Sequence, residues 1–393
     1  MMRPWWWFIL AALALGVQLA TAAPWIAITT NSLLLPPAVR LRLGGEKDLQ
    51  KDCQTASKGD GFIWAHDATK GYEVATKLFQ TIALERHSTT TIWFPAFTDT
   101  EVLQGLARVL NDNTDRLGGV TAQANAWPKT PCHVLQLSWA SSSPSNNYLM
   151  EEPSSNDESN NEVAVTATKT WVDNTLCRLS LCPYTASLSR AAVGLESANV
   201  QVGPIIVRPT ITAYQGGSAA AAVALATTFW EGVTEIATTP EQEVATSLLI
   251  APSVYDANFV EFAATCDELI EASVQVVQAD QIVGRAWFHP NYNASMIGHD
   301  KIVAGHALPA SMVQGFIDTT TLGVSAVERP NLERVTIAND AVRWTPHATI
   351  NLLRRSQLTA AKQVEAASAN KKPNAIYARN VLKIITDQQL ISK

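Results

Sequence analysis

The sequence predicts an α/β fold of mixed α+β layers, in two domains joined by a polar linker. Of its 393 residues, 47% are apolar and 16% are charged, a composition that supports a sizeable core and excludes disordered and collagen-like chains. Runs of strand formers alternate with apolar residues at helical spacing in both halves of the chain, which is typical of layered α/β structure. Residues 141–165, between the halves, are rich in serine and acidic residues, so we expect a flexible acidic linker there.

Residues 1–24 have the features of a signal peptide. Arg3 supplies a positive charge, residues 5–19 form an apolar run, and residues 20–22 give a small-x-small cleavage site. The run is shorter than the ~20 residues that a membrane-spanning helix needs. We therefore expect cleavage and no stable membrane span afterwards, with an uncleaved signal anchor as the alternative.

The segment after the predicted cleavage site resembles an organelle transit peptide. Residues 25–45 contain Arg40 and Arg42 and no acidic residue. A signal peptide followed by such a leader predicts that the chain enters the secretory pathway and is secreted, or is imported into a secretory-route organelle such as a complex plastid. Plain secretion with a polar N-terminal linker remains open.

Residues 46–140 predict a small α/β domain of unknown role. Apolar residues recur at helical spacing over 72–82 and over 102–110, and strand formers fill 91–94 and 133–137. We find no phosphate loop, metal spacing or nucleophile motif in this region.

Residues 166–393 predict the second domain. Its expected helices and strands are a helix that starts near residue 170 and ends before Pro183, strands at 203–207, 247–251 and 282–289, a helix at 218–236, an amphipathic helix through 259–270, and terminal helices at 349–366 and 374–386.

The charge distribution limits the partners that we expect. The net charge of −6 argues against nucleic acid as a partner. From Arg329 to the C-terminus, however, there are eleven basic and four acidic residues. This basic segment could hold a small anionic ligand, or it could be ordinary solvated helix surface.

Five short segments of the second domain carry a family resemblance. They are Trp171 with 181–184 (Leu-Cys-Pro-Tyr), 246–252 (Thr-Ser-Leu-Leu-Ile-Ala-Pro), 288–292 (Phe-His-Pro-Asn-Tyr), Pro346 with 349–354, and 376–380. Together they resemble the domain-of-unknown-function 1415 family, over roughly residues 166–386. The chain has Trp344 and Asn351 where the family pattern implies arginine and histidine. The resemblance implies no assigned reaction.

Cys182 and His289 are the candidate catalytic residues. Cys182 precedes a proline at a predicted helix end, where a thiol can be presented as a nucleophile, but the helix dipole there disfavours the thiolate. His289 precedes Pro290 at the end of a strand, where α/β folds place ligands, and it could act as a base. The alternatives are a buried structural cysteine and a histidine that is satisfied by a backbone carbonyl.

Four further residues are candidate ligand-binding residues. Arg285 shares a strand face with His289, and Arg354 could clamp a carboxylate or phosphate, although it could equally be an exposed helix charge. Tyr184 and Tyr292 belong to the motifs given above and support the same site.

The sequence assigns no metal ligands and leaves any cofactor unknown. His299 and His306 lie seven residues apart and could bind a metal only with further ligands. Three functions therefore remain open: an enzyme of unknown reaction with a cysteine/histidine site, a noncatalytic module for a small anion, and a structural or interaction protein.

Overall fold

The computed structural model describes residues 50, 61–84, 87–126, 132–140, 155–210, 217–252, 255–319, 329–367 and 375–387. The predicted signal peptide and leader lie outside these residues, and so does most of the predicted linker. Cleavage of a signal peptide and the destination of the chain therefore stay predictions. The described residues confirm mixed α/β architecture, with two four-stranded sheets and a small hairpin.

The first sheet has the strand order β1-β2-β4-β3. β1 (Gly61–Trp64) and β2 (Thr89–Phe94) are parallel, and β3 (Val120–Ala126) and β4 (His133–Trp139) complete the sheet in antiparallel pairs. Both predicted helices are present, as α3 (Gly71–Leu84) and α4 (Thr100–Asp112), and both predicted strands are present as β2 and β4. We did not foresee β3, because its sequence, Val-Thr-Ala-Gln-Ala-Asn-Ala, contains few strand formers.

The second sheet has the strand order β7-β8-β10-β9. β7 (Ile205–Pro209) is parallel to β8 (Thr246–Ala251), and β10 (Ala348–Arg354) lies antiparallel between β8 and β9 (Val283–Phe288). The prediction of a helix over 349–366 is wrong in its first part, because those residues form the central strand β10. Helix α11 (Arg355–Ala367) begins directly after it.

Helix α5 (Ser155–Trp171) overturns part of the linker prediction. It begins inside the segment that we expected to be flexible, and fifteen residues before the helix that we expected from about residue 170. Its buried side chains include Ala164 and Thr168, one turn apart. Such a narrow buried stripe gives little apolar periodicity, so the sequence pattern reads as linker. A π-helical turn, η2 (Val172–Cys177), continues it.

The other predicted helices of the second half are present. They are α6 (Gly217–Thr238), a long helix made of α7 (Phe259–Ala264), η4 (Thr265–Glu271) and α8 (Ala272–Val277), and α12 (Ala375–Thr386). Two helices that we did not predict, α9 (Ala310–Thr319) and α10 (Leu332–Ala341), pack with α12 around a small apolar cluster of their own. The remaining short elements are β5 (Thr185–Ser187), β6 (Arg190–Ala191), η3 (Glu196–Ala198), η5 (Ala279–Gln281) and η6 (Ala294–Ile297).

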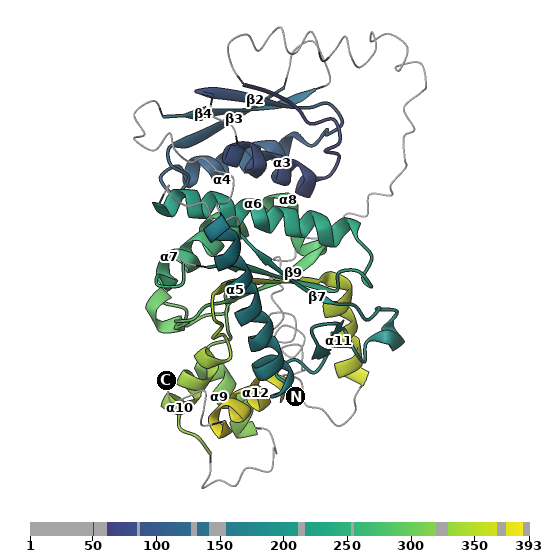
Figure 1. Ribbon diagram of the computed structural model, residues 1–393, viewed down its shortest axis with the longest axis vertical. Coiled ribbons are helices and arrows are strands. Elements are labelled where there is room, and N and C mark those ends of the chain that lie inside the picture. Colours follow the sequence, from purple (N-terminus) through teal and green to yellow (C-terminus); the bar gives the residue numbers. More distant parts are fainter. Residues whose placement is uncertain are drawn as a thin grey trace, which may run out of the picture.

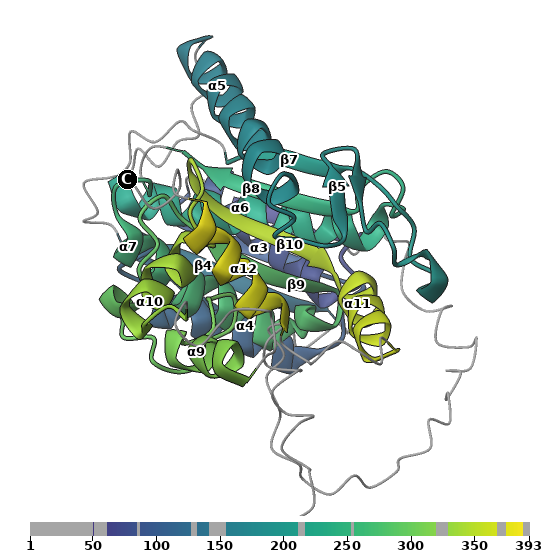
Figure 2. The same cartoon turned by 90° about the horizontal axis from the view of Figure 1, so that it is seen from below.

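Two layers of helices lie between the two sheets (Figure 1). Helix α3 packs on α6, and α4 packs on α8, so that one apolar core runs from the first sheet to the second. Helices α9, α10 and α12 lie on the opposite face of the second sheet (Figure 2). The helix of residues 259–277 is therefore covered on one side by the first sheet unit, residues 61–140, and on the other by the second sheet.

Within the described residues, no helix combines the length and the apolar character needed to cross a bilayer.

The contact between α4 and α8 is close enough to test by adding one methyl group. A Cβ at Gly105 would lie 2.6 Å from Cγ1 of Val276, a side chain with little rotamer freedom. We expect Gly105→Ala to lower the free energy of unfolding by about 1–3 kcal/mol. The matched change Gly315→Ala, on α9 where a Cβ meets nothing within 4 Å, should instead raise it by up to about 1 kcal/mol. Urea unfolding of both variants measures the difference, and equal effects would contradict the close packing.

Candidate metal centre

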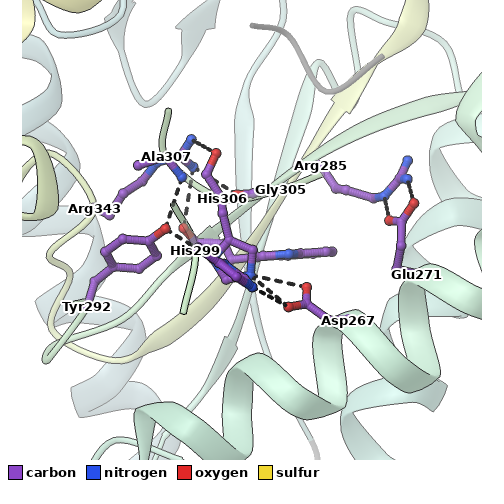
Figure 3. A network of polar contacts seen from close by, with 10 residues as sticks. Asp267, Glu271, Arg285, Tyr292, His299, Gly305, His306, Ala307 and Arg343 are labelled. Atoms are coloured by element: carbon purple, nitrogen blue, oxygen red, sulfur yellow. Dashed lines mark hydrogen bonds and ion pairs between the residues drawn. The ribbon is translucent and has the colours of Figure 1, made fainter. Parts of the chain in front are cut away.

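Three side chains of the metal-binding type meet beside the second sheet. Asp267, His299 and His306 each offer one ligand atom, and these atoms all lie within 4.8 Å of one another. Nε2 of His306 is 3.1 Å from both carboxylate oxygens of Asp267, and Nε2 of His299 is 3.5 Å from one of them. Figure 3 shows the two imidazoles and the carboxylate pointing toward one another. We call these three residues the triad.

Asp267 reaches the triad from a wide turn in the helix of residues 259–277. The turn, η4, has π-helical hydrogen bonding with α-helix on either side. Such insertions are rare and occur often at functional sites, because they shift the side chains of one turn around the helix axis. The wide turn thus directs a carboxylate toward the loop that carries the two histidines.

Each histidine of the triad directly follows a glycine in the left-handed conformation. Gly298 has φ +66° and Gly305 has φ +81°. Glycine adopts these angles without the penalty that a Cβ brings. A Cβ at Gly305 would also lie 2.2 Å from the Trp287 ring. Two Gly-His turns therefore aim the imidazoles, and the second turn fits only a residue without a side chain.

A second group of side chains fixes His306. The Tyr292 hydroxyl is 3.0 Å from Nδ1 of His306 and accepts a hydrogen bond of 2.9 Å from the Ala307 N–H. The Arg343 guanidinium donates to the carbonyl oxygens of His306 (3.2 Å) and Gly305 (3.3 Å). Metal-binding histidines usually have such a partner on the second ring nitrogen, which sets the tautomer and the orientation of the ring. The partner of His306 leaves Nε2 facing Asp267.

Burial shifts the pKa values of two side chains at the triad, Tyr292 and His299. It raises the pKa of Tyr292 to about 12, so the phenol is neutral. Burial, followed by the neighbouring His306, lowers the pKa of His299, although Asp267 acts in the opposite direction. A neutral imidazole is the form that binds a metal ion. Within the described residues, Nδ1 of His299 is buried and has no hydrogen-bond partner.

The triad fits a divalent transition-metal ion. Imidazole and carboxylate ligands bind zinc at about 2.0–2.2 Å, which places neighbouring ligand atoms roughly 3–4 Å apart. The 3.1 Å and 3.5 Å separations given above agree with that spacing. Two histidines and one carboxylate are also the ligand set of non-haem iron centres. The exposed fraction is 24% for the Asp267 side chain and 14% for His299, so one side of the triad is open to solvent.

Comparison with known proteins gives one family. The match is to the family described as "Protein of unknown function (DUF1415)". Residues 163–303 carry the DUF1415 match. It confirms the predicted resemblance over these residues, a shorter span than the one we expected. No curated protein and no solved structure matches the chain.

The DUF1415 match and the triad overlap only in part. Asp267 and His299 lie inside the matched residues, and His306 lies three residues beyond their end. Sequence reasoning considered both histidines but missed Asp267, which is one of several acidic residues on an amphipathic helix. The repeated Gly-His pair, seven residues apart, was the available signal for the two aimed imidazoles.

Cys182 of the DUF1415 segment lies where burial disfavours the thiolate. Burial raises its pKa, although the Thr185 side chain and the Tyr184 N–H contribute hydrogen bonds that lower it. A reactive cysteine needs the opposite shift. Its predicted catalytic role thus gains no support from its surroundings.

His289, the other predicted catalytic residue, is fully buried. Its Nε2 donates to the Tyr255 carbonyl oxygen at 2.6 Å, and its Nδ1 accepts from the Asn291 N–H at 2.9 Å. Both nitrogens are therefore engaged by backbone groups, as in the alternative of a satisfied histidine. Neither contact involves Cys182, and burial lowers the pKa of His289.

The four predicted ligand-binding residues separate in the structure. Tyr292 alone touches the triad. Arg285 forms a buried, two-bond ion pair with Glu271, beside the triad in Figure 3. Tyr184 lies 3.3 Å from a carboxylate oxygen of Glu365, and its pKa is raised to about 12, chiefly by burial.

Arg354 is not an exposed charge, and three N–H donors of its guanidinium are already bound within the protein. Its guanidinium donates to the carbonyl oxygens of Ile236, Thr239 and Val244, at 2.6–2.8 Å. The Ile236 and Thr239 carbonyls lie at and just beyond the end of α6, where helix carbonyls lack partners within the helix, and the Val244 carbonyl lies in the segment before β8. Arg354 therefore caps α6 from the end of β10.

We expect Arg354→Met to destabilise the fold, because it leaves three partly buried carbonyl oxygens unpaired. The free energy of unfolding should fall by at least about 2 kcal/mol. Arg355→Ala, one residue along, should change it by under about 0.5 kcal/mol. Urea unfolding measures both. A stable Arg354→Met protein that loses binding of a small anion would instead favour the predicted clamp.

Asp340 is a buried acid that predicts a pH dependence. It lies near the end of α10, is 7% exposed, and accepts a hydrogen bond of 3.3 Å from the Ala294 N–H. Burial raises its pKa from 3.8 to about 6. The folded state therefore favours the protonated carboxyl.

The effect of the Asp340 carboxyl on the free energy of unfolding can be measured by comparing the wild type with Asp340→Asn, which does not ionise. The protonated carboxyl stabilises the folded wild type below about pH 4, and this stabilisation is lost as the pH rises through about 6. Relative to Asp340→Asn, the wild type should lose about 2 kcal/mol between pH 4 and pH 7, because part of the stabilisation is already lost at pH 4. Urea unfolding at a series of pH values measures the difference, and a difference independent of pH would contradict the raised pKa.

Proposed function

We propose that this protein binds one divalent transition-metal ion through Asp267, His299 and His306, in a centre of the catalytic kind. The observation that carries the proposal is the convergence of their three ligand atoms within 4.8 Å of one another. They come from a helix and from two turns of a loop, so tertiary structure alone brings them together.

The number and type of the ligands favour a catalytic centre over a structural one. Structural zinc sites use four protein ligands and are rich in cysteine, whereas catalytic sites use three and keep a position for water or substrate. The exposed edge of Asp267 and His299 leaves room for such a position. A bound ion would supply a Lewis acid or an activated water. Tyr292 and Arg343 contribute by fixing the ring and the backbone of His306.

The same centre also provides a binding position for the predicted small anion. The donors of Arg285 point to Glu271, and three donors of Arg354 point to backbone carbonyls. A carboxylate or phosphate ligand would instead bind at the open position of the ion. The enzyme hypothesis is thus retained with the metal centre in place of the pair Cys182 and His289.

Cobalt binding tests the proposal. Titration of the purified, metal-stripped full chain with Co²⁺ should show one site per chain by visible absorbance and by calorimetry, with Zn²⁺ as competitor. Asp267→Asn keeps the side-chain shape but removes the anionic ligand, and His299→Gln removes an imidazole. Each should weaken binding roughly 100-fold or more, because each leaves two of the three ligands.

The matched control is Asp300→Asn, an exposed acid next to His299 and outside the triad. Its affinity for Co²⁺ should stay within about twofold of the wild type, because an exposed charge outside the ligand set acts only weakly. Absence of stoichiometric binding by the wild type, or binding by Asp267→Asn with unchanged affinity, would refute the metal centre.

A further inference from the structure

The first sheet unit, residues 61–140, touches the helix that carries Asp267 immediately beside that residue. We propose that this unit positions the metal ligand, with Asn113 as the positioning residue. The inference rests on the proposed metal centre, and it gives a role to a part of the chain that lies wholly outside the DUF1415 match.

Asn113 holds the wide turn from outside the helix. It is the C-cap residue of α4 and is 5% exposed. Its side-chain amide donates to the carbonyl oxygen of Glu268 at 3.1 Å, and also to the Val109 carbonyl of its own helix at 2.9 Å. The Glu268 carbonyl belongs to the residue directly after Asp267, so this bond fixes the backbone next to the ligand.

Arg116 braces the same contact at two points. Its guanidinium donates to the Asn113 side-chain oxygen at 2.5 Å and forms an ion pair of 2.9 Å with the Glu268 carboxylate. The first bond orients the amide of Asn113 so that its N–H groups face the two carbonyls. The ion pair holds the side chain of Glu268 against the residues that follow α4.

The position of Asn113 is itself set by apolar packing. Helix α4 lies on α8 with Gly105 against Val276, and α3 lies on α6 within the same continuous core. The end of α4 therefore cannot shift without disturbing that core. A π-helical turn departs from the regular helix ladder and needs support from its surroundings. Asn113 supplies this support at the residue following Asp267.

The test separates positioning from simple stabilisation. Asn113→Leu keeps a similar side-chain volume but removes the amide. The matched control is Thr227→Val, which removes a buried 3.1 Å hydrogen bond from Thr227 on α6 to the Phe79 carbonyl, in the same interface but on a different helix from Asp267. Both variants should lose stability in urea unfolding.

Only Asn113→Leu should change the metal site. At a temperature where all proteins are folded, we expect its Co²⁺ affinity to fall by about 10-fold or more, with a shifted visible spectrum, since groups supporting a ligand typically contribute 10- to 100-fold. Thr227→Val should match the wild type in both readouts. Arg116→Gln, on a partly exposed residue, should weaken binding in the same direction by a smaller factor, and it decides the question if Asn113→Leu does not fold.

The outcomes are distinguishable. Wild-type protein that binds no Co²⁺ removes the metal centre and this inference with it. Wild-type protein that binds Co²⁺, together with Asn113→Leu and Arg116→Gln proteins that bind it as Thr227→Val does, removes the positioning role alone.

Discussion

Packing of the helix of residues 259–277 between the two sheets is the constraint on which the rest of the structure depends. Its apolar side chains complete one core that runs from β1 to β9, and Gly105 permits α4 to approach Val276 closely. The polar edge of the same helix carries Asp267 and Glu271, each paired with a group from the segment 283–306. One helix therefore serves both the core and the polar site. The wide turn at Thr265–Glu271 lets its apolar side chains face the core while Asp267 and Glu271 face the segment 283–306.

Buried polar groups around this helix are held mainly by backbone atoms. Arg343 and Arg354 are bound to carbonyl oxygens, and His289 uses a carbonyl and an N–H. A buried cation bound to several carbonyls fixes chain segments that no regular element connects. Arg343 in this way holds the loop around His306, and Arg354 joins the end of α6 to β10. Of the two arginines that we considered for anion binding, Arg354 holds a helix end, and Arg285 pairs with Glu271.

The sequence predicts correctly those helices and strands in which the spacing of apolar residues matches the buried face. The prediction fails where contacts between distant segments decide whether a segment forms a helix or a strand. The continuous apolar run at Leu248–Ile250 indicates β8 correctly. Residues 349–353 have apolar side chains at spacings that suit a helix or a strand, and pairing with β8 and β9 selects the strand. Both histidines of the triad are visible in the sequence. Asp267 was missed because neither the wide turn nor its distant partners leave a local pattern.

The position of β10 has a consequence for how the chain is made. β10 comes from residues 348–354, yet it lies in the middle of the second sheet, between strands that leave the ribosome much earlier. β8 and β9 have no direct ladder to each other, so the side of each strand that pairs with β10 has no partner until residues 348–354 have been synthesised. During translation, the first sheet can close early, while the half that bears His306 stays open. A nascent chain that stops before β10 therefore exposes the unpaired edges of two strands with apolar side chains, and these edges can pair with a chaperone or with another chain.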